Sequence, residues 1–388
     1  LARATHQWEN YVASMADAAA KASEPRVRRD VLFRLATVFD TELGDLVRTE
    51  DVLGQVLALD PNDAEALAFL DRVYDKQGDY EKLADVLRRR LAVTDGSREL
   101  VALHLRLGKI LADVIDDAPG AVASYLAVLE QESRSPEALE ALERIYFRAE
   151  QWEDLYQIYE KMLDIAPGDE ALSDCYARMA KITSDVLGQR DRAIELWRRV
   201  LDLRGADPVA LSSLADLHEQ AEEWRELTEV LDSQIRATDD PEARIPAYKR
   251  LGHVWGEKLA RERNALECWK KVIEINPGDV EALQAIAANY RNAAAWEELS
   301  DTLRNLIGVG QETFPAETLK DLFAELGELE GSTLRRVDAA IDAWRQGLNL
   351  DPADTRALGA LETLFTQEGR WEECVEVLER RVEALASV

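Results

Sequence analysis

The sequence predicts an all-α protein, an α-solenoid of stacked helix pairs with about 21 helices. The first observation is a large aromatic residue, followed by Glu in all but one case, that recurs at intervals of 72, 72, 72, 72 and 75 residues: Trp8, Tyr80, Trp152, Trp224, Trp296 and Trp371. A second marker, a large apolar residue before a small one, recurs at intervals of 72, 72, 72 and 75: Leu35, Leu107, Met179, Leu251 and Leu326. Apolar residues never alternate with period two for long enough to indicate a strand.

Each 72-residue unit divides into four segments of about 14 to 19 residues with apolar residues three and four apart, which is typical of amphipathic helices. In chain order we expect an orphan helix at 1–22 and five units at 23–99, 100–171, 172–243, 244–315 and 316–388. They should form one continuous solenoid, because a single helix pair cannot bury its apolar face alone. The unpaired first helix and the last helix, which is not plainly polar, favour a fragment of a longer array. Fraying or a homotypic contact at the ends is the alternative.

Helix starts are marked by a short oxygen-bearing residue at one equivalent position of each unit. Such a side chain can accept a hydrogen bond from the first turn, and the predicted N-caps are Asp63, Ser135, Asp207, Asp279 and Asp354. The three extra residues of the fourth unit are expected in a lengthened exit loop. There, Gly308, Gly310 and Pro315 are poor continuers of a helix.

Composition argues against nucleic-acid and membrane partners. The net charge of −29 repels phosphate backbones and anionic headgroups. No stretch approaches the ~18 apolar residues that a bilayer crossing needs, so we expect a soluble chain without membrane insertion. Cys175, Cys268 and Cys374 lie too far apart for a disulfide framework or a metal site, and unpaired thiols favour the cytoplasm. The start at Leu1 leaves a processed leader open, and with it the compartment.

Residues 136–169 resemble the tetratricopeptide repeat, a 34-residue helix-turn-helix module. The matching positions are Leu139, Leu142, Tyr146, Trp152, Tyr159 and Pro167, whereas Glu143 and Leu155 stand where the family favours small residues. The other half of each unit restores small residues, so the chain resembles ten modules in a two-module supra-repeat. This resemblance implies a right-handed superhelix whose first helices line a concave face, and a role in protein binding.

Small residues in the other half, such as Gly108 and Gly252, should let two helix backbones approach. An aromatic residue of the second helix, Tyr125 or Trp269, is expected to fill the neighbouring gap.

The sequence contains no motif that carries catalytic chemistry. Phosphate loops, zinc-protease motifs, nucleophile elbows and calcium loops are all missing. The histidines, His6, His104, His218 and His253, fall in different repeats, and His218 replaces a Tyr or Phe, which favours a packed side chain. Cys268 and Cys374 are predicted to be small core hydrophobes. We therefore predict no enzyme activity, no cofactor and no metal.

One exposed position on the first helix of each module carries a cation in four consecutive modules. These candidate binding residues are Arg72, Lys109, Arg144 and Lys181, with Lys76 and Arg148 one helical turn after two of them. The resemblance places them on the concave face, where an acidic or carboxylate-bearing segment of a protein could dock. The alternative is a solvated face on which Glu140 simply pairs with Arg144. The family's Lys and Asn clamp for carboxylate tails is not reproduced.

Two functions follow from this pattern. The first is a non-enzymatic interaction scaffold that holds a partner segment in the concave groove. The second is a structural spacer or assembly component that contacts partners or copies of itself through its ends. The two differ in whether the partner footprint falls in the groove or at the terminal helices.

Overall fold

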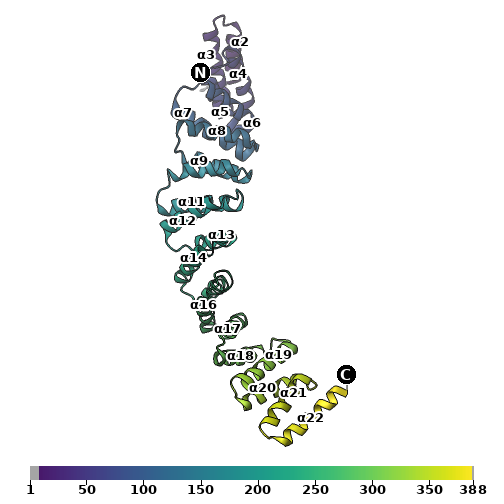
Figure 1. Ribbon diagram of the computed structural model, residues 1–388. Helices are drawn as coiled ribbons and strands as arrows, with labels where there is room; N and C mark the ends of the chain where they lie inside the picture. Colours follow the sequence, from purple (N-terminus) through teal and green to yellow (C-terminus); the bar gives the residue numbers. More distant parts are fainter. Residues whose placement is uncertain (1–7, 387–388) are drawn as a thin grey trace. The chain divides into compact units, whose positions relative to one another are not determined.

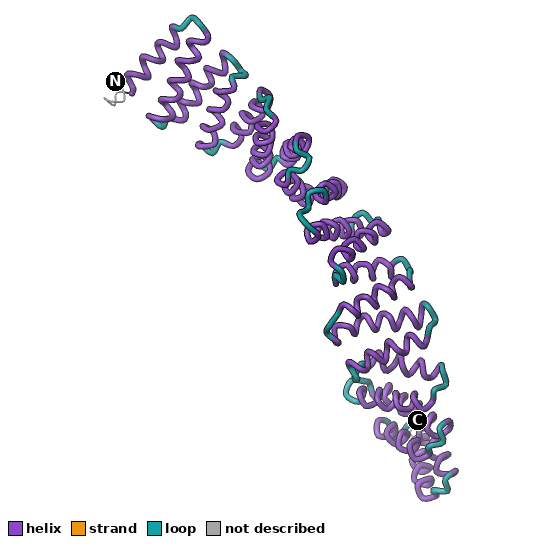
Figure 2. Tube along the Cα trace, turned by 90° about the vertical axis from the view of Figure 1, so that its left-hand side faces the viewer, coloured by secondary structure: helices purple, strands orange, loops and turns teal. Residues whose placement is uncertain are grey.

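The computed structural model describes residues 8–386, and within that range the chain forms 21 α-helices and no strand (Figure 1). Figure 2 shows the helices joined by short loops. The predicted all-α fold is therefore confirmed. The chain divides into two compact units, one that ends at Leu196 and one that begins at Trp197.

Unit 1 contains ten complete helices, each of which packs on the next in chain order. They are α2 Trp8–Lys21, α3 Pro25–Val38, α4 Leu46–Leu59, α5 Ala64–Gln77, α6 Tyr80–Val93, α7 Ser97–Ile110, α8 Ala118–Gln131, α9 Pro136–Arg148, α10 Trp152–Leu163 and α11 Asp169–Asp185. The next helix, α12 Arg190–Arg204, crosses the division between the units. Packing between neighbours in the chain is what a stacked array of helix pairs requires.

Unit 2 repeats this order with ten further helices, again packed successively. They are α13 Pro208–Gln220, α14 Trp224–Ala237, α15 Pro241–His253, α16 Glu262–Ile275, α17 Val280–Asn292, α18 Trp296–Gly310, α19 Ala316–Glu328, α20 Val337–Leu350, α21 Thr355–Gln367 and α22 Trp371–Ala386. Four first helices, α3, α7, α15 and α19, continue into a turn of π-helix: η1 Phe39–Leu43, η2 Leu111–Ile115, η3 Val254–Lys258 and η4 Leu329–Thr333. The π-turns lengthen these helices beyond their partners.

Four of the five predicted N-caps accept a backbone hydrogen bond. The side chains of Asp63, Asp207, Asp279 and Asp354 accept from an N–H in the first turn of the following helix. Ser135 occupies the N-cap position of α9, but its hydroxyl makes no such bond. Pro136 occupies the first position of α9, where a missing N–H leaves no unpaired donor, as Pro208 does in α13.

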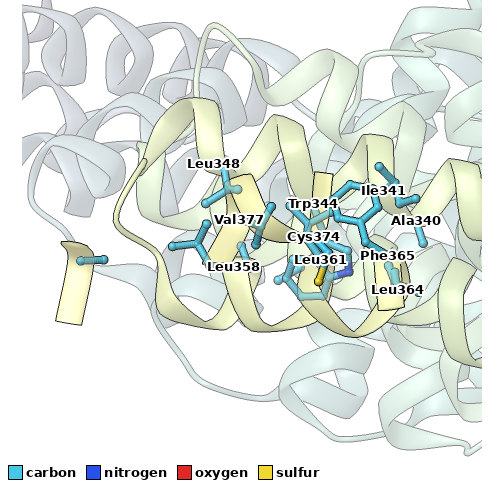
Figure 3. Packing of buried hydrophobic residues seen from close by; sticks show 13 residues of the cluster. Ala340, Ile341, Trp344, Leu348, Leu358, Leu361, Leu364, Phe365, Cys374 and Val377 are labelled. Atoms are coloured by element: carbon cyan, nitrogen blue, oxygen red, sulfur yellow. The ribbon is translucent and has the colours of Figure 1, made fainter. Parts of the chain in front are cut away.

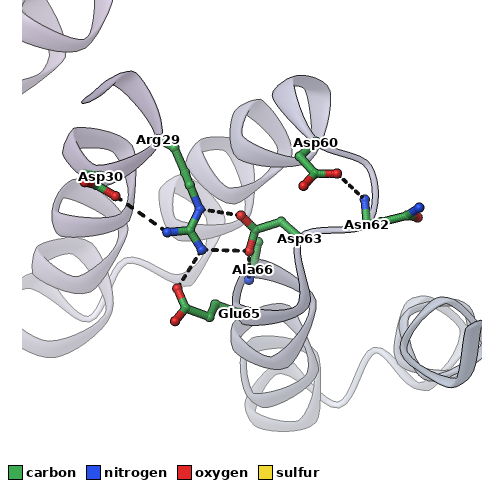
Figure 4. A network of polar contacts seen from close by, with 7 residues as sticks. All are labelled: Arg29, Asp30, Asp60, Asn62, Asp63, Glu65 and Ala66. Atoms are coloured by element: carbon green, nitrogen blue, oxygen red, sulfur yellow. Dashed lines mark hydrogen bonds and ion pairs between the residues drawn. The ribbon is translucent and has the colours of Figure 1, made fainter. Parts of the chain in front are cut away.

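The Asp63 cap also links two modules (Figure 4). Arg29 of α3 donates to the Asp63 carboxylate, with 3.0 Å between its Nη2 and Oδ1, and to Glu65 of α5 over 2.6 Å. The hydrogen bond from Arg29 lowers the pKa of Asp63, and the backbone N–H of Ala66 adds to the effect. One carboxylate therefore starts α5 and anchors it to α3.

The glycines of the first helices are required by aromatic side chains. A Cβ atom on Gly252 would lie 2.5 Å from Cε2 of Trp269, and one on Gly108 would lie 2.9 Å from Cζ of Tyr125. The prediction that an aromatic residue of the second helix fills the space beside each glycine is thus confirmed. The ring lies directly on the glycine and leaves no space for a side chain.

The structure corrects the predicted C-terminal end of α18 at two other glycines. Gly308 and Gly310 lie inside this helix, and the connection to α19 is only Gln311–Pro315. A Cβ on Gly310 would collide with the ring of Phe314, so the last turn needs glycine to accommodate that ring. Glycine weakens helix propensity, and here tertiary packing outweighs that weakness.

The core of unit 2 shows how the helix pairs bury their apolar faces. Figure 3 shows Trp344 of α20, Leu361 and Phe365 of α21 and Val377 of α22 packed together with Cys374. Cys374 is 6% exposed, so its predicted role as a small core hydrophobe is confirmed. Its Sγ lies 3.4 Å from Oγ1 of Thr366.

Candidate partner-binding surface

The structure places all six candidate cations on exposed surface of first helices. Arg72 and Lys76 lie on α5, Lys109 on α7, Arg144 and Arg148 on α9, and Lys181 on α11. Lys76 forms an ion pair, with 2.6 Å between its Nζ and Oδ1 of Asp40. Among the described residues, the other five form no ion pair, and Arg144 does not pair with Glu140. These five are therefore available without the loss of an ion pair, although Arg72 lies over the ring of Phe69, 4.8 Å from its centroid.

Two adjoining grooves bring three of the six cations together. The polar groove, between α7 and α9, has a volume of about 930 Å³ and is lined by Ala102, Leu105, Arg106, Lys109, Asp113, Tyr125, Glu137, Glu140, Ala141, Glu143, Arg144, Met162 and Arg178. The apolar groove, between α9, α10 and α11, has a volume of about 610 Å³ and is lined by Glu143, Arg144, Phe147, Trp152, Tyr159, Arg178, Lys181, Ile182, Asp185 and Val186. Glu143, Arg144 and Arg178 border both grooves. Arg72, Lys76 and Arg148 line neither groove.

The residues shared by the two grooves form a hydrogen-bonded network. The Tyr159 hydroxyl donates to Oε1 of Glu143 over 2.9 Å, and Arg178 forms an ion pair with the same oxygen. Burial raises the pKa of Tyr159, and the negative charge of Glu143 raises it further, so the phenol stays protonated and keeps donating. Glu143 is therefore occupied within the protein. It stands where the resembling family favours a small residue.

The wall of the apolar groove is formed by side chains that the sequence reasoning missed. Phe147 packs edge-on against Trp152, with 5.8 Å between the ring centroids and an interplanar angle of 89°. Phe147 nevertheless remains 60% exposed, and Val186 is 47% exposed. A signal for Phe147 was present in the sequence, because the equivalent positions of the other four units are all polar: Asp75, Glu219, Arg291 and Thr366.

The histidines and cysteines of the described residues are not gathered into a metal site. Between Trp8 and Ala386, no group of three or more His, Cys, Asp or Glu side chains could hold a metal ion. His218 is 2% exposed, and its Nδ1 lies 2.7 Å from Oε2 of Glu223, so its predicted packed role is confirmed. Burial raises the pKa of Cys268 to about 12, which keeps this half-buried thiol protonated. None of the described helices is long and apolar enough to cross a bilayer.

The architecture defines an α-helical repeat protein, and comparison with known families identifies the repeat. The tetratricopeptide repeat model matches residues 66–99, 138–172 and 210–245. The starts of these matches are 72 residues apart, in agreement with the period read from the aromatic residues. The chain therefore contains tetratricopeptide repeats, arranged in a two-module supra-repeat.

Individual relatives are distant. Superkiller protein 3 of Schizosaccharomyces pombe is 23% identical over 270 residues, which are 66% of this chain and 18% of that protein. The chain thus matches less than a fifth of this curated relative's length.

Two solved structures are similar over larger shares of their own chains. The Naa15/Naa10 assembly bound to HypK-THB is 14% identical, with 92% of this chain and 64% of that chain covered and a TM-score of 0.43. The C-terminal part of a TPR repeat-containing protein from Cytophaga hutchinsonii is 17% identical, with 66% and 99% covered and a TM-score of 0.37. At these scores, neither structure bears on the function of this chain.

Proposed function

We propose that the chain is a non-enzymatic scaffold that binds a segment of a partner protein along the first helices α7, α9 and α11. One observation carries the proposal: the polar and apolar grooves share Arg144, Lys109 lines the polar groove, and Lys181 lines the apolar groove. A partner segment could bind across both grooves. Apolar anchors would supply most of its affinity, and charge complementarity would supply selectivity.

The polar groove suits an acidic or mixed-charge partner segment. Its lining contains four cations and four acids, so the formal charges of the lining cancel, whereas the whole chain carries a net charge of −29. Since the surrounding surface is acidic, a wholly acidic segment would be repelled before it reached Lys109 or Arg144. Arg72 and Arg148 are proposed to make flanking contacts with a longer segment. Lys76 would first have to release Asp40.

Tetratricopeptide repeats are typically non-catalytic scaffolds, which supports a binding role for the chain. No step of chemistry is assigned to any residue.

Amine-reactive crosslinking in the source cells, mapped to residues, tests the proposal. We expect crosslinks between a partner and Lys109 and Lys181, and few at Lys258 and Lys271, which lie in unit 2. The matched control is the double variant Lys109→Arg and Lys181→Arg. It keeps both charges and removes both amines, so it should capture the partner without these crosslinks. A footprint confined to other lysines would overturn the groove proposal.

The exposed face of α22 favours a second candidate function, an assembly component that contacts a second copy of itself through this helix. Its exposed large apolar residues, spaced 4, 3, 4 and 3 apart, are Trp371, Val375, Leu378, Val382 and Leu385. This spacing is the one at which two helices pack along a common seam. On α18, the equivalents of Val375, Leu378 and Val382 are buried, in a core shared with α19.

Sedimentation equilibrium distinguishes this candidate. An α22-mediated dimer should dissociate in the variant Val382→Glu, because a charge in an apolar seam is left without a partner. Val47→Glu is the matched control, since Val47 is similarly exposed but lies on α4. A wild-type chain that sediments as a monomer would exclude this candidate.

A further inference from the structure

We infer that the apolar groove is an anchor pocket for one aromatic or large aliphatic side chain of a peptide segment, which carries a carboxylate next to that side chain. The inference deepens the proposed function, on which it rests, because it names the chemistry of the partner and the residues that read it. The anchor contacts Phe147, Trp152 and Val186. The neighbouring carboxylate pairs with Arg144 or Lys181.

The apolar part of the inference comes from the exposed ring of Phe147. Phe147 is the one apolar residue at its repeat position, so the fold does not demand a phenylalanine there. Its ring packs edge-on against Trp152 and lines the groove together with Ile182 and Val186. A rigid aromatic wall binds an apolar side chain with little loss of conformational entropy.

The charged part of the inference comes from which cations remain available. The apolar groove is lined by three cations, Arg144, Arg178 and Lys181, and by two acids, Glu143 and Asp185. Glu143 is bound by Arg178 and by the Tyr159 hydroxyl. Two cations therefore face a single acid, Asp185, whose carboxylate accepts a hydrogen bond from Ser184 over 2.7 Å. A partner carboxylate neutralises the remaining positive charge of the groove, whereas a partner lysine or arginine would increase it.

The size of the groove limits the occupant to a short segment. A volume of about 610 Å³ lies within the range of sites that enclose a small ligand, and here it accommodates one or two large side chains. The polar groove continues from Arg144 toward α7, so the rest of the segment can extend in that direction.

The test is a display library of random short peptides selected on the full chain, followed by anisotropy titrations of the enriched peptides labelled with fluorescein. We expect enriched peptides to carry Trp, Phe, Leu or Ile next to Asp or Glu. Replacing that apolar residue by Ala, or the acid by its amide, should weaken binding. Enrichment of sequences that lack this pair would overturn the inference.

Two matched variants locate the binding. Phe147→Thr introduces the residue found at the equivalent Thr366, so the fold tolerates it, and we expect at least about a tenfold loss of affinity. Val209→Thr removes an equally exposed apolar side chain from α13 and should leave affinity unchanged. Circular dichroism and the melting temperature of Phe147→Thr should match the wild type. Unchanged affinity in Phe147→Thr would overturn the inference.

The outcomes separate the inference from the proposed function. If peptides bind but Phe147→Thr has no effect, while a cellular partner still crosslinks at Lys109 and Lys181, only the anchor pocket is wrong. If the wild type enriches no peptide and no partner crosslinks at these lysines, both the anchor pocket and the scaffold proposal are wrong.

Discussion

The region α5–α7 and the region α9–α11 are 72 residues apart in the sequence and occupy equivalent places in the repeat. Both lie in the first compact unit, but the ion pairs that their polar residues form are different. In the first region, Asp71 is bound by Arg90 and Arg106 at 2.5 Å each, and Arg106 also reaches Asp75 at 3.0 Å. The Asp71 side chain is only 2% exposed. Ion pairs thus join α5, α6 and α7.

In the second region, the equivalent residues are Glu143, Met162, Arg178 and Phe147. Glu143 still pairs with an arginine of the next module, Arg178. It has no second arginine partner, because Met162 stands at the position equivalent to Arg90. Phe147 stands at the position equivalent to Asp75, so Arg178 has no second carboxylate partner at that position. An exposed aromatic ring occupies the position instead. Two substitutions at fixed repeat positions therefore separate a structural ion-pair network from a groove suited to binding.

The largest expected effect is on the ion pairs themselves. Asp71→Ala should lower the local free energy of unfolding by about 2 kcal/mol, because two charge-assisted hydrogen bonds to a buried carboxylate are lost while Arg90 keeps Glu99 and Arg106 keeps Asp75. Glu143→Ala should cost only about 1 kcal/mol, since its partner Arg178 is half exposed. Native-state hydrogen exchange of the α5–α7 and α9–α11 amides measures both, because a repeat array need not unfold in one step. Equal costs would break the comparison.

A graft of the first region onto the second should nearly abolish peptide binding. Phe147→Asp combined with Met162→Arg installs the residues of Asp75 and Arg90, which adds an acid beside the proposed anchor and removes the apolar wall. We expect the affinity for library-selected peptides to fall by more than tenfold, or about 1.4 kcal/mol, in anisotropy titrations. The melting temperature should not fall, because the repeat already accommodates these residues. Retained affinity would show that the two regions do not differ in binding.

Charge reversal should have a somewhat smaller effect. Arg144→Glu with Lys181→Glu should weaken binding about tenfold, because the carboxylate of the peptide then faces like charge. The equivalent pair in the first region, Arg72→Glu with Lys109→Glu, makes the same change in net charge and should weaken binding less. Affinity should also fall as ionic strength rises from about 0.01 to 0.1 M, where the screening length shrinks from about 30 to 10 Å. Equal losses for both pairs would place the binding outside the apolar groove.

The smallest expected effect is a difference between the two regions in how stability depends on pH. Burial lowers the pKa of His104 on α7, against a weak opposing attraction from Glu130, so the folded chain favours neutral imidazole. The resulting stabilisation is present above the ordinary pKa of about 6.5 and is lost as pH falls through the lowered folded value. The equivalent residue on α11 is Tyr176, so this histidine occurs in the first region alone of the two. Between about pH 7 and pH 5, the melting temperature should fall less in His104→Tyr than in the wild type.

The repeat phase and the exposure of the cations could be predicted because both depend on local periodicity. In a stacked array, equivalent positions meet equivalent neighbours, so one aromatic residue per unit was enough to set the register of every helix. For the same reason, Arg72, Lys109, Arg144 and Lys181 were all expected on the outer surface, and all are exposed. Phe147 could have been found by the same reasoning, as the apolar exception in a polar column.

The ion pairs and grooves could not be read from periodicity. Lys76 pairs with Asp40 and Arg178 with Glu143, residues 36 and 35 positions apart that lie on neighbouring first helices. Whether such side chains meet depends on the distance between helices and on rotamers, and the pattern of apolar residues specifies neither. The C-terminal end of α18 was predicted too early for a related reason. Gly310 lies inside the helix because the ring of Phe314 packs against it, and that contact is not visible in the sequence.

By itself, then, the sequence determined the helices, their 72-residue period, the burial of Cys374 and the exposed row of cations, because burial in a one-dimensional stack follows from position within the repeat. Only the tertiary structure decided which cations are occupied by acids, that Glu143 is bound by Arg178 and Tyr159, and that Phe147 and Trp152 form the wall of a groove. These features arise between modules, where side chains from helices about 35 residues apart compete for the same partners, and that competition is settled by distances in space.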